Sequence, residues 1–278
     1  MKESMEIKHI NLKISNLKKT ILYYTDILGF RVTIKHPKEA TLYIEDGKPL
    51  ITLHEIEGAL PKSNTTGLYH FAILLPTRSD LGSLLRRFIQ KGYQIDGASD
   101  HLVSEALYMH DPDGNGIEIY VDKPRSSWKF ENNQVVMDTL PFPFEEILSS
   151  TPDITMEQLP TRTKIGHIHL HVNHLVEATT YYTTQLKLDL MLDYHSARFL
   201  SYDGYHHHIG INIWNGSNAS LPKPNQVGLD HVTIEVKNES LYLSIKEALE
   251  QTNNIEIQSN NMFVTKDPSG NTFQFVRK

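Results

Sequence analysis

Two residues in this chain have the types and the setting of metal ligands. His70 lies in an apolar run that begins at Gly67, and Glu118 lies in the run that follows a turn at 111–115. If both runs are strands of one curved sheet, the two side chains face its concave side together. Two histidines and one carboxylate form a facial set that holds Fe(II) and leaves positions open for a substrate and for dioxygen. The pair therefore predicts a metal site that needs one more histidine. The alternative is a structural role, with His70 capping a strand and Glu118 in solvent.

The elements that must position these residues belong to an internal repeat. Four short segments recur in the same order: Ile7–Leu12 as Ile165–Leu170, Tyr23–Thr25 as Tyr181–Thr183, Gly67–His70 as Gly228–His231, and Asp111–Asn115 as Asp267–Asn271. Several matches in order indicate a duplicated domain. Each half is itself halved, because His9 and His70 have similar strand-then-helix contexts. The chain therefore divides into four modules, which start near residues 5, 67, 165 and 228.

We expect each module to form a strand, a helix and three further strands, which gives an α+β fold. Module one begins with apolar alternation over 10–14, followed by Asn16 as a helix N-cap and Gly29 as a helix stop. Turns at Asp46–Gly47 and Asp203–Gly204 separate later strands. The predicted domains are residues 5–123 and 164–278, joined by a proline-rich connector over 124–163. A connector of this length leaves open which modules pair in space.

The third ligand comes from one of two places. His167, His169 and His171 alternate along one run, which puts three imidazoles on one face of a strand. Of these, His167 matches His9 in the repeat and is the natural ligand, whereas the other two are polar residues on the strand face. The equivalents of His70 and Glu118 in the second half are His231 and Gln274. Because glutamine is a poor anionic ligand, we expect that second copy to be degraded.

Two further segments carry polar groups close to the predicted site. His206, His207 and His208 are consecutive, and strand alternation would send the outer two to one face and His207 to the other. Tyr108 precedes Glu118 by ten residues, in the strand paired across the turn, where its hydroxyl can lie beside a metal. The alternative is that Tyr108 is a core residue, as a tyrosine on a strand commonly is.

Composition excludes several classes of function. The chain has 278 residues and no cysteine, so disulfides, thiolate metal sites and cysteine nucleophiles are ruled out. A net charge of −6 argues against a nucleic-acid partner. The charged N-terminus lacks the apolar segment of a secretion signal, and the apolar run at Phe71–Leu75 is far too short to span a membrane. We therefore expect a protein of the cytoplasm.

Taken together, these residues resemble the vicinal oxygen chelate superfamily, which is built from βαβββ modules. Within it they are most similar to the type I extradiol ring-cleavage dioxygenases of the catechol 2,3-dioxygenase kind. The segment Asp100–Ser104 (Asp-His-Leu-Val-Ser), Tyr108 and Glu118 match the later part of that motif, with His70 as its histidine. The resemblance covers all four modules and leaves out mainly the connector.

The resemblance implies Fe(II), or alternatively Mn(II), Zn(II) or Ni(II), and a small aromatic diol with dioxygen as substrates. It places metal ligands at His70, Glu118 and His167. It also implies that His208 contacts dioxygen or handles the substrate proton. Tyr108 and His101 would hydrogen-bond the catecholate and its ring-opened successor. A homodimer is a further expectation.

The departure from the family lies in which modules carry the site. The two-domain dioxygenases hold their metal in the C-terminal domain, whereas Glu118 and Tyr108 lie here in module two, and module four has Gln274 and Val264 instead. We infer that modules two and three pair, since only this arrangement also gathers the run 206–208. If modules one and two paired instead, His9 would replace His167.

Two rival functions follow from the same resemblance. A glyoxalase-like metal-dependent isomerase or lyase typically adds a glutamate near Thr52 or Ile209, which this chain lacks there. A metal-free small-molecule-binding member of the superfamily would not need the two-histidine, one-glutamate set.

Overall fold

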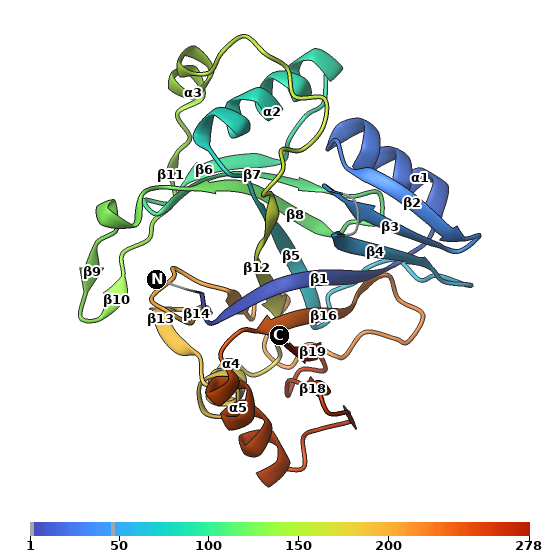
Figure 1. The fold of residues 1–278 in the computed structure, drawn as a ribbon, viewed down its shortest axis with the longest axis vertical. Coiled ribbons are helices and arrows are strands. Elements are labelled where there is room, and N and C mark those ends of the chain that lie inside the picture. The colour runs from blue at the N-terminus through green and yellow to red at the C-terminus, as the bar shows by residue number, and fades with distance from the viewer. Residues whose placement is uncertain (1–2, 46–47) are drawn as a thin grey trace.

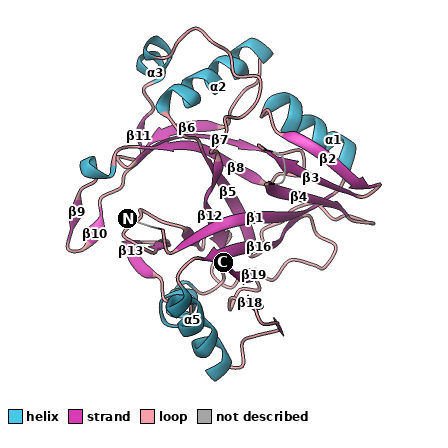
Figure 2. Cartoon of the chain, in the orientation of Figure 1, coloured by secondary structure: helices cyan, strands magenta, loops and turns pink. Residues whose placement is uncertain are grey.

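Two curved mixed sheets form the centre of the molecule, and helices lie at its two ends (Figure 1). The computed structural model describes residues 3–45 and 48–278, so the expected turn at Asp46–Gly47 lies outside the described residues. The α+β fold with four βαβββ modules is confirmed, and Figure 2 shows the strands dominating the molecule. Asn16 caps the first helix by accepting a hydrogen bond from the Lys19 N–H, as predicted.

The first sheet combines module one with module four. Its eight strands within the described residues are, in spatial order, β17 (Ile257–Gln258), β18 (Met262–Lys266), β19 (Thr272–Arg277), β16 (Gly228–Val236), β1 (Met5–Ile14), β4 (Pro49–Glu55), β3 (Glu39–Tyr43) and β2 (Arg31–His36). The central contact is the antiparallel pair β1–β16.

The second sheet combines module two with module three. Its nine strands within the same described ranges are, in order, β11 (Leu140–Pro141), β6 (Gly97–Asp100), β7 (Ser104–His110), β8 (Gly116–Asp122), β5 (Gly67–Leu74), β12 (Lys164–His171), β15 (Ile209–Asn212), β14 (Ala197–Ser201) and β13 (Asp189–Tyr194). The antiparallel pair β5–β12 confirms that these two modules meet across the connector. Each sheet thus takes one module from each half of the sequence, and the boundaries 5–123 and 164–278 remain a proposal about the repeat.

The helical segments lie outside the sheets. They are α1 (Leu17–Leu22) with the π-helical turn η1 (Tyr23–Ile27), α2 (Arg78–Lys91), the 3₁₀ turn η2 (Arg125–Ser127), α3 (Phe144–Ser150), α4 (Leu175–Thr180) with the π-helical turn η3 (Tyr181–Gln185), and α5 (Glu239–Gln251). The connector also forms a small hairpin of β9 (Phe130–Glu131) and β10 (Gln134–Val135). No helix within residues 3–45 and 48–278 has the length and apolar character that crossing a bilayer requires.

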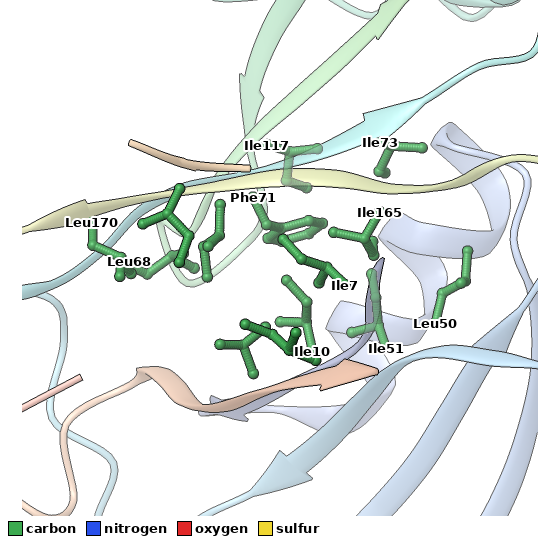
Figure 3. Close-up of a cluster of buried hydrophobic side chains, with 14 of the residues drawn as sticks. Ile7, Ile10, Leu50, Ile51, Leu68, Phe71, Ile73, Ile117, Ile165 and Leu170 are labelled. Carbon is green, nitrogen blue, oxygen red and sulfur yellow. The ribbon is translucent and has the colours of Figure 1, made fainter. Parts of the chain in front are cut away.

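The main hydrophobic core fills the space between the two sheets. Figure 3 shows Ile7, Ile10 and Ile51 of the first sheet facing Phe71 and Ile165 of the second. All five side chains are almost completely buried. Successive residues of a strand point to opposite faces of its sheet. Since the apolar residues of β5, β8 and β12 face this core, the polar residues between them face the opposite, concave side of the second sheet.

Two of the repeated sequence motifs meet in space. In the first half, the Tyr24 hydroxyl donates to Asp111 Oδ2 at 3.2 Å, and in the second half the Tyr182 hydroxyl donates to Asp267 Oδ2 at 2.8 Å. Each aspartate also accepts hydrogen bonds within its own Asp-Pro-x-Gly-Asn turn. Each contact ties the helical segment of one sheet to a turn of the other. The repeat therefore preserves a link between the two sheets.

We predict that Tyr24→Phe and Tyr182→Phe each lower the free energy of unfolding by about 1–3 kcal/mol, since each leaves a buried carboxylate without one of its donors. Urea unfolding measures the change. Tyr202→Phe is the matched control, because its buried hydroxyl has no hydrogen-bond partner among the described residues. An equal loss of stability in that control would show that the hydroxyl–aspartate bonds are not the cause.

Candidate metal centre

His70, Glu118 and His167 converge on one point in the second sheet. His70 Nε2 lies 3.1 Å and His167 Nε2 3.2 Å from the same oxygen, Glu118 Oε2. The two imidazole nitrogens lie 3.4 Å from each other. All three side chains are buried, and they are the group within the described residues whose ligand atoms lie close enough to share a metal ion. The structure thus brings together the three residues predicted as ligands.

The geometry of this cluster fits a divalent metal. Ligand atoms that bind one ion at about 2.1 Å and at right angles to each other lie about 3 Å apart. The three spacings in the cluster are close to that value, and the donor set is two imidazoles and one carboxylate. Such a set matches the facial triad of non-haem Fe(II) oxygenases, which leaves coordination positions free.

The protonation states also suit metal binding. Burial alone would raise the pKa of Glu118, but the adjacent imidazoles of His167 and His70 hold it well below its ordinary value. Burial lowers the pKa of His167 to about 4, against the opposing effect of Glu118. At neutral pH the carboxylate is therefore ionised and His167 is neutral, which are the forms that bind metals.

An irregularity in β5 aims its side chains into the cleft. His70 pairs with His169 and Leu68 pairs with Leu170, so Tyr69 is an extra residue in the ladder. Such a bulge turns neighbouring side chains to one face. Gly116 on β8 makes room for the bulge, since a Cβ there would lie 2.2 Å from the Tyr69 carbonyl oxygen. A second irregularity makes Gly166 an extra residue in β12, and both irregularities recur at the equivalent places between β1 and β16 in the first sheet.

A cavity of about 310 Å³ opens beside the cluster. Aromatic side chains form much of its wall, and no lysine or arginine of the described residues lines it. The lining residues are Tyr69, His70, Ser99, His101, Ser104, Tyr108, Glu118, Met137, Asp138, Thr139, His169, Leu192, Tyr194, Phe199, His207 and Trp214. The sequence singled out Tyr108 but not the other aromatic residues of the wall, because these come from separate segments of the chain: Tyr69, Tyr194, Phe199 and Trp214.

Tyr108 and His101 meet at this cavity as a hydrogen-bonded pair. His101 Nδ1 lies 2.8 Å from the Asp138 carbonyl oxygen, which can only accept, so this nitrogen carries the proton. His101 Nε2 is then an acceptor, and the Tyr108 hydroxyl donates to it at 2.6 Å. Burial, followed by the charge of Glu118, raises the pKa of Tyr108 well above its ordinary value, so the phenol stays protonated. Asp138 belongs to the connector, which therefore contributes to the cleft wall.

The histidine that the structure places in the cleft is His207, whereas we expected His208. The His207 ring lies 4.0 Å from the His167 ring, centroid to centroid. His208 Nδ1 is instead 3.0 Å from Ser201 Oγ, and His208 lines a separate small cavity with Glu3 and Lys164. The prediction assumed strand alternation over 206–208, but β15 begins only at Ile209. The alternation rule therefore did not apply to this run: His207 lines the cleft and His208 does not.

The equivalent place in the first sheet has lost the metal-binding pattern. A larger cavity, about 800 Å³, lies there and is lined by His9, His231 and Gln274. His9 Nε2 is 2.8 Å from Thr52 Oγ1, and His231 Nε2 is 2.9 Å from Asn11 Nδ2. His9 thus lies in the sheet that does not contain His70, which rules out the alternative in which it replaces His167.

The chain is similar in sequence to proteins of known activity. The chain is 44% identical over 282 residues to the catechol-2,3-dioxygenase of Bacillus subtilis, covering 99% of this chain and 98% of that protein. It is 31% identical over 122 residues to biphenyl-2,3-diol 1,2-dioxygenase 3 of Rhodococcus globerulus, covering 42% of this chain and 63% of that protein.

Solved structures agree on the fold. A Bacillus subtilis protein described as a candidate dioxygenase superposes with a TM-score of 0.64 at 14% identity, covering 100% of this chain and 86% of that one. Glyoxalase I from Zea mays superposes with a TM-score of 0.59 at 16% identity, covering 99% and 93%. Residues 6–119 match the sequence profile of the Glyoxalase/Bleomycin resistance protein/Dioxygenase superfamily. The chain belongs to this superfamily.

Proposed function

We propose that this protein is a metal-dependent extradiol dioxygenase, which opens the ring of a catechol-type aromatic with dioxygen. The observation that carries the proposal is the buried His70–Glu118–His167 cluster at the floor of an aromatic cleft. The likeness over nearly the whole chain to a protein named catechol-2,3-dioxygenase supports the same reaction. Fe(II) is the metal we propose, because the two-histidine, one-carboxylate set is the one that such oxygenases use.

His70, Glu118 and His167 would hold the metal. When bound, it would supply a Lewis acid for the adjacent substrate oxygens and an electron path between substrate and dioxygen. The Tyr108–His101 pair would orient a substrate oxygen through its hydrogen bonds. His207, on the wall next to His167, would accept the proton of a substrate hydroxyl and later return it. The ring contacts come from Tyr69, Phe199 and Trp214.

The cleft favours a substrate ring without charged substituents. Its lining among the described residues includes the carboxylates Glu118 and Asp138 but no lysine or arginine that could pair with a carboxylate on the substrate. Burying an unpaired charge costs several kcal/mol. The proposed substrates are therefore catechol itself and catechols with small apolar substituents.

Replacing any one of the three ligands should abolish tight metal binding. We expect His70→Ala, Glu118→Gln and His167→Ala each to weaken Fe(II) affinity by at least about 100-fold, since even the partners of metal ligands contribute 10–100-fold. Metal content after gel filtration, by mass spectrometry, measures this. His9→Ala and His231→Ala are matched controls at the repeat-equivalent positions and should keep the metal. Loss of metal in the controls alone would move the site to the first sheet.

The reaction can be tested by oxygen uptake. Fe(II)-loaded protein should consume oxygen and form a yellow ring-opened product with catechol and with alkyl catechols, and metal-free protein should not. With 3,4-dihydroxybenzoate we expect kcat/KM to be lower by at least about 100-fold, because its carboxylate has no partner in the cleft.

Two other results would show which part of the proposal is wrong. No uptake with any catechol by metal-loaded protein would contradict the proposal and favour the glyoxalase-like isomerases. Equal rates with the carboxylated substrate would contradict the assignment of an uncharged substrate but keep the dioxygenase.

A further inference from the structure

A chain of hydrogen bonds runs from a carboxylate behind the cleft to the histidine on its wall. Asp122 Oδ1 lies 3.0 Å from His206 Nε2, and His206 Nδ1 lies 2.7 Å from His207 Nδ1. His206 is completely buried, and His207 is 8% exposed and lines the cleft. The three residues thus connect β8 of module two to the segment before β15 of module three.

The Asp122 carboxylate sets the direction of each hydrogen bond when His206 is a neutral imidazole. The Asp122 carboxylate offers acceptors, so His206 Nε2 must donate to it. In a neutral imidazole the other nitrogen is then an acceptor, so His206 Nδ1 accepts from His207 Nδ1–H. The remaining nitrogen, His207 Nε2, is left with a free lone pair. It has no hydrogen-bond partner within residues 3–45 and 48–278.

We propose that Asp122 and His206 are positioning residues that hold His207 in the tautomer whose Nε2 lone pair faces the cleft. His207 then meets a substrate hydroxyl as an acceptor, and the proton that it takes stays on Nε2 until it returns to the product. The catalytic part of this inference rests on the proposed function, whereas the tautomer does not. Fixing a histidine tautomer through a carboxylate is the role that the aspartate has in serine proteases.

The surroundings of the chain show how Asp122 is held. The Tyr205 hydroxyl also donates to Asp122 Oδ1 at 3.2 Å, and Tyr120 and Tyr205 share a hydrogen bond of 2.7 Å. The His206 ring packs against Trp128 at 5.3 Å between centroids. The imidazole is completely buried, whereas the Asp122 side chain is 26% exposed and is held by these two donors.

The tautomer can be measured directly by ¹⁵N NMR of the histidine rings. The protein would be loaded with diamagnetic Zn(II), and His207→Gln would assign the His207 signals by their loss. We expect an unprotonated Nε2 and a protonated Nδ1 for His207 in the unsubstituted protein. A protonated Nε2 there would overturn the proposal.

The role of Asp122 is tested by Asp122→Asn, whose amide can donate to His206 Nε2 and reverse the chain. We expect Nε2 of His207 to become protonated and kcat of the Fe(II)-loaded enzyme to fall by about 100-fold or more, with KM little changed. Tyr205→Phe is the matched control: it removes the other donor to Asp122 but keeps the carboxylate, and should keep both the tautomer and kcat. His206→Leu, which cuts the chain in the middle, is the second variant and should lower kcat as Asp122→Asn does.

The outcomes separate this inference from the proposed function. A fall in kcat without a change of tautomer in Asp122→Asn would overturn it, because the effect would be structural. An unchanged kcat in Asp122→Asn and in His206→Leu would overturn it as well. If the unsubstituted enzyme cleaves no catechol, the proposed function fails, and the NMR result still decides the tautomer.

Discussion

The candidate site depends on one contact, the antiparallel pairing of β5 with β12. These strands belong to different halves of the chain, and His70 and His167 lie side by side only because the strands pair. Glu118 then reaches both imidazoles from β8, which runs parallel to β5. Since the pairing closes a long loop, it requires a large apolar core to stabilise it, and the core between the two sheets supplies that burial. The cluster is thus a consequence of tertiary pairing, and no single module contains it.

The same fold carries two clefts with different chemistry. Both central strand pairs have equivalent irregularities, so their side chains face the two clefts in the same way. The difference lies in a few side chains: Gln274 in place of Glu118 removes the anionic ligand. Ile51 pairs with Ile10 in the first sheet as Ile209 pairs with Ile168 in the second. By this register Pro49 is the equivalent of His207, so the first sheet also lacks a histidine at that position. Metal binding needs the complete set of donors. A duplicated scaffold therefore keeps its shape while one copy loses its chemistry.

The sequence was sufficient for the fold and for the three residues that converge, because repeats and strand alternation are local patterns. It identified the pairing of modules two and three from the distribution of Glu118 and the histidine run 206–208. It failed at His208, because the run lies before β15 begins, where strand alternation does not fix the face of a side chain. It also missed Asp138 and Trp214, which reach the cleft only through long-range contacts. The chain from Asp122 to His207 has no sequence signature, since it joins two modules through single hydrogen bonds.

The most direct test of this account is anomalous X-ray scattering at the iron edge from crystals of Fe(II)-loaded protein. The account predicts one strong peak per chain, within bonding distance of His70 Nε2, His167 Nε2 and a Glu118 carboxylate oxygen. A peak beside His9 and His231 in the first sheet would contradict it. So would protein that contains iron in stoichiometric amount but shows no peak at the three predicted ligands.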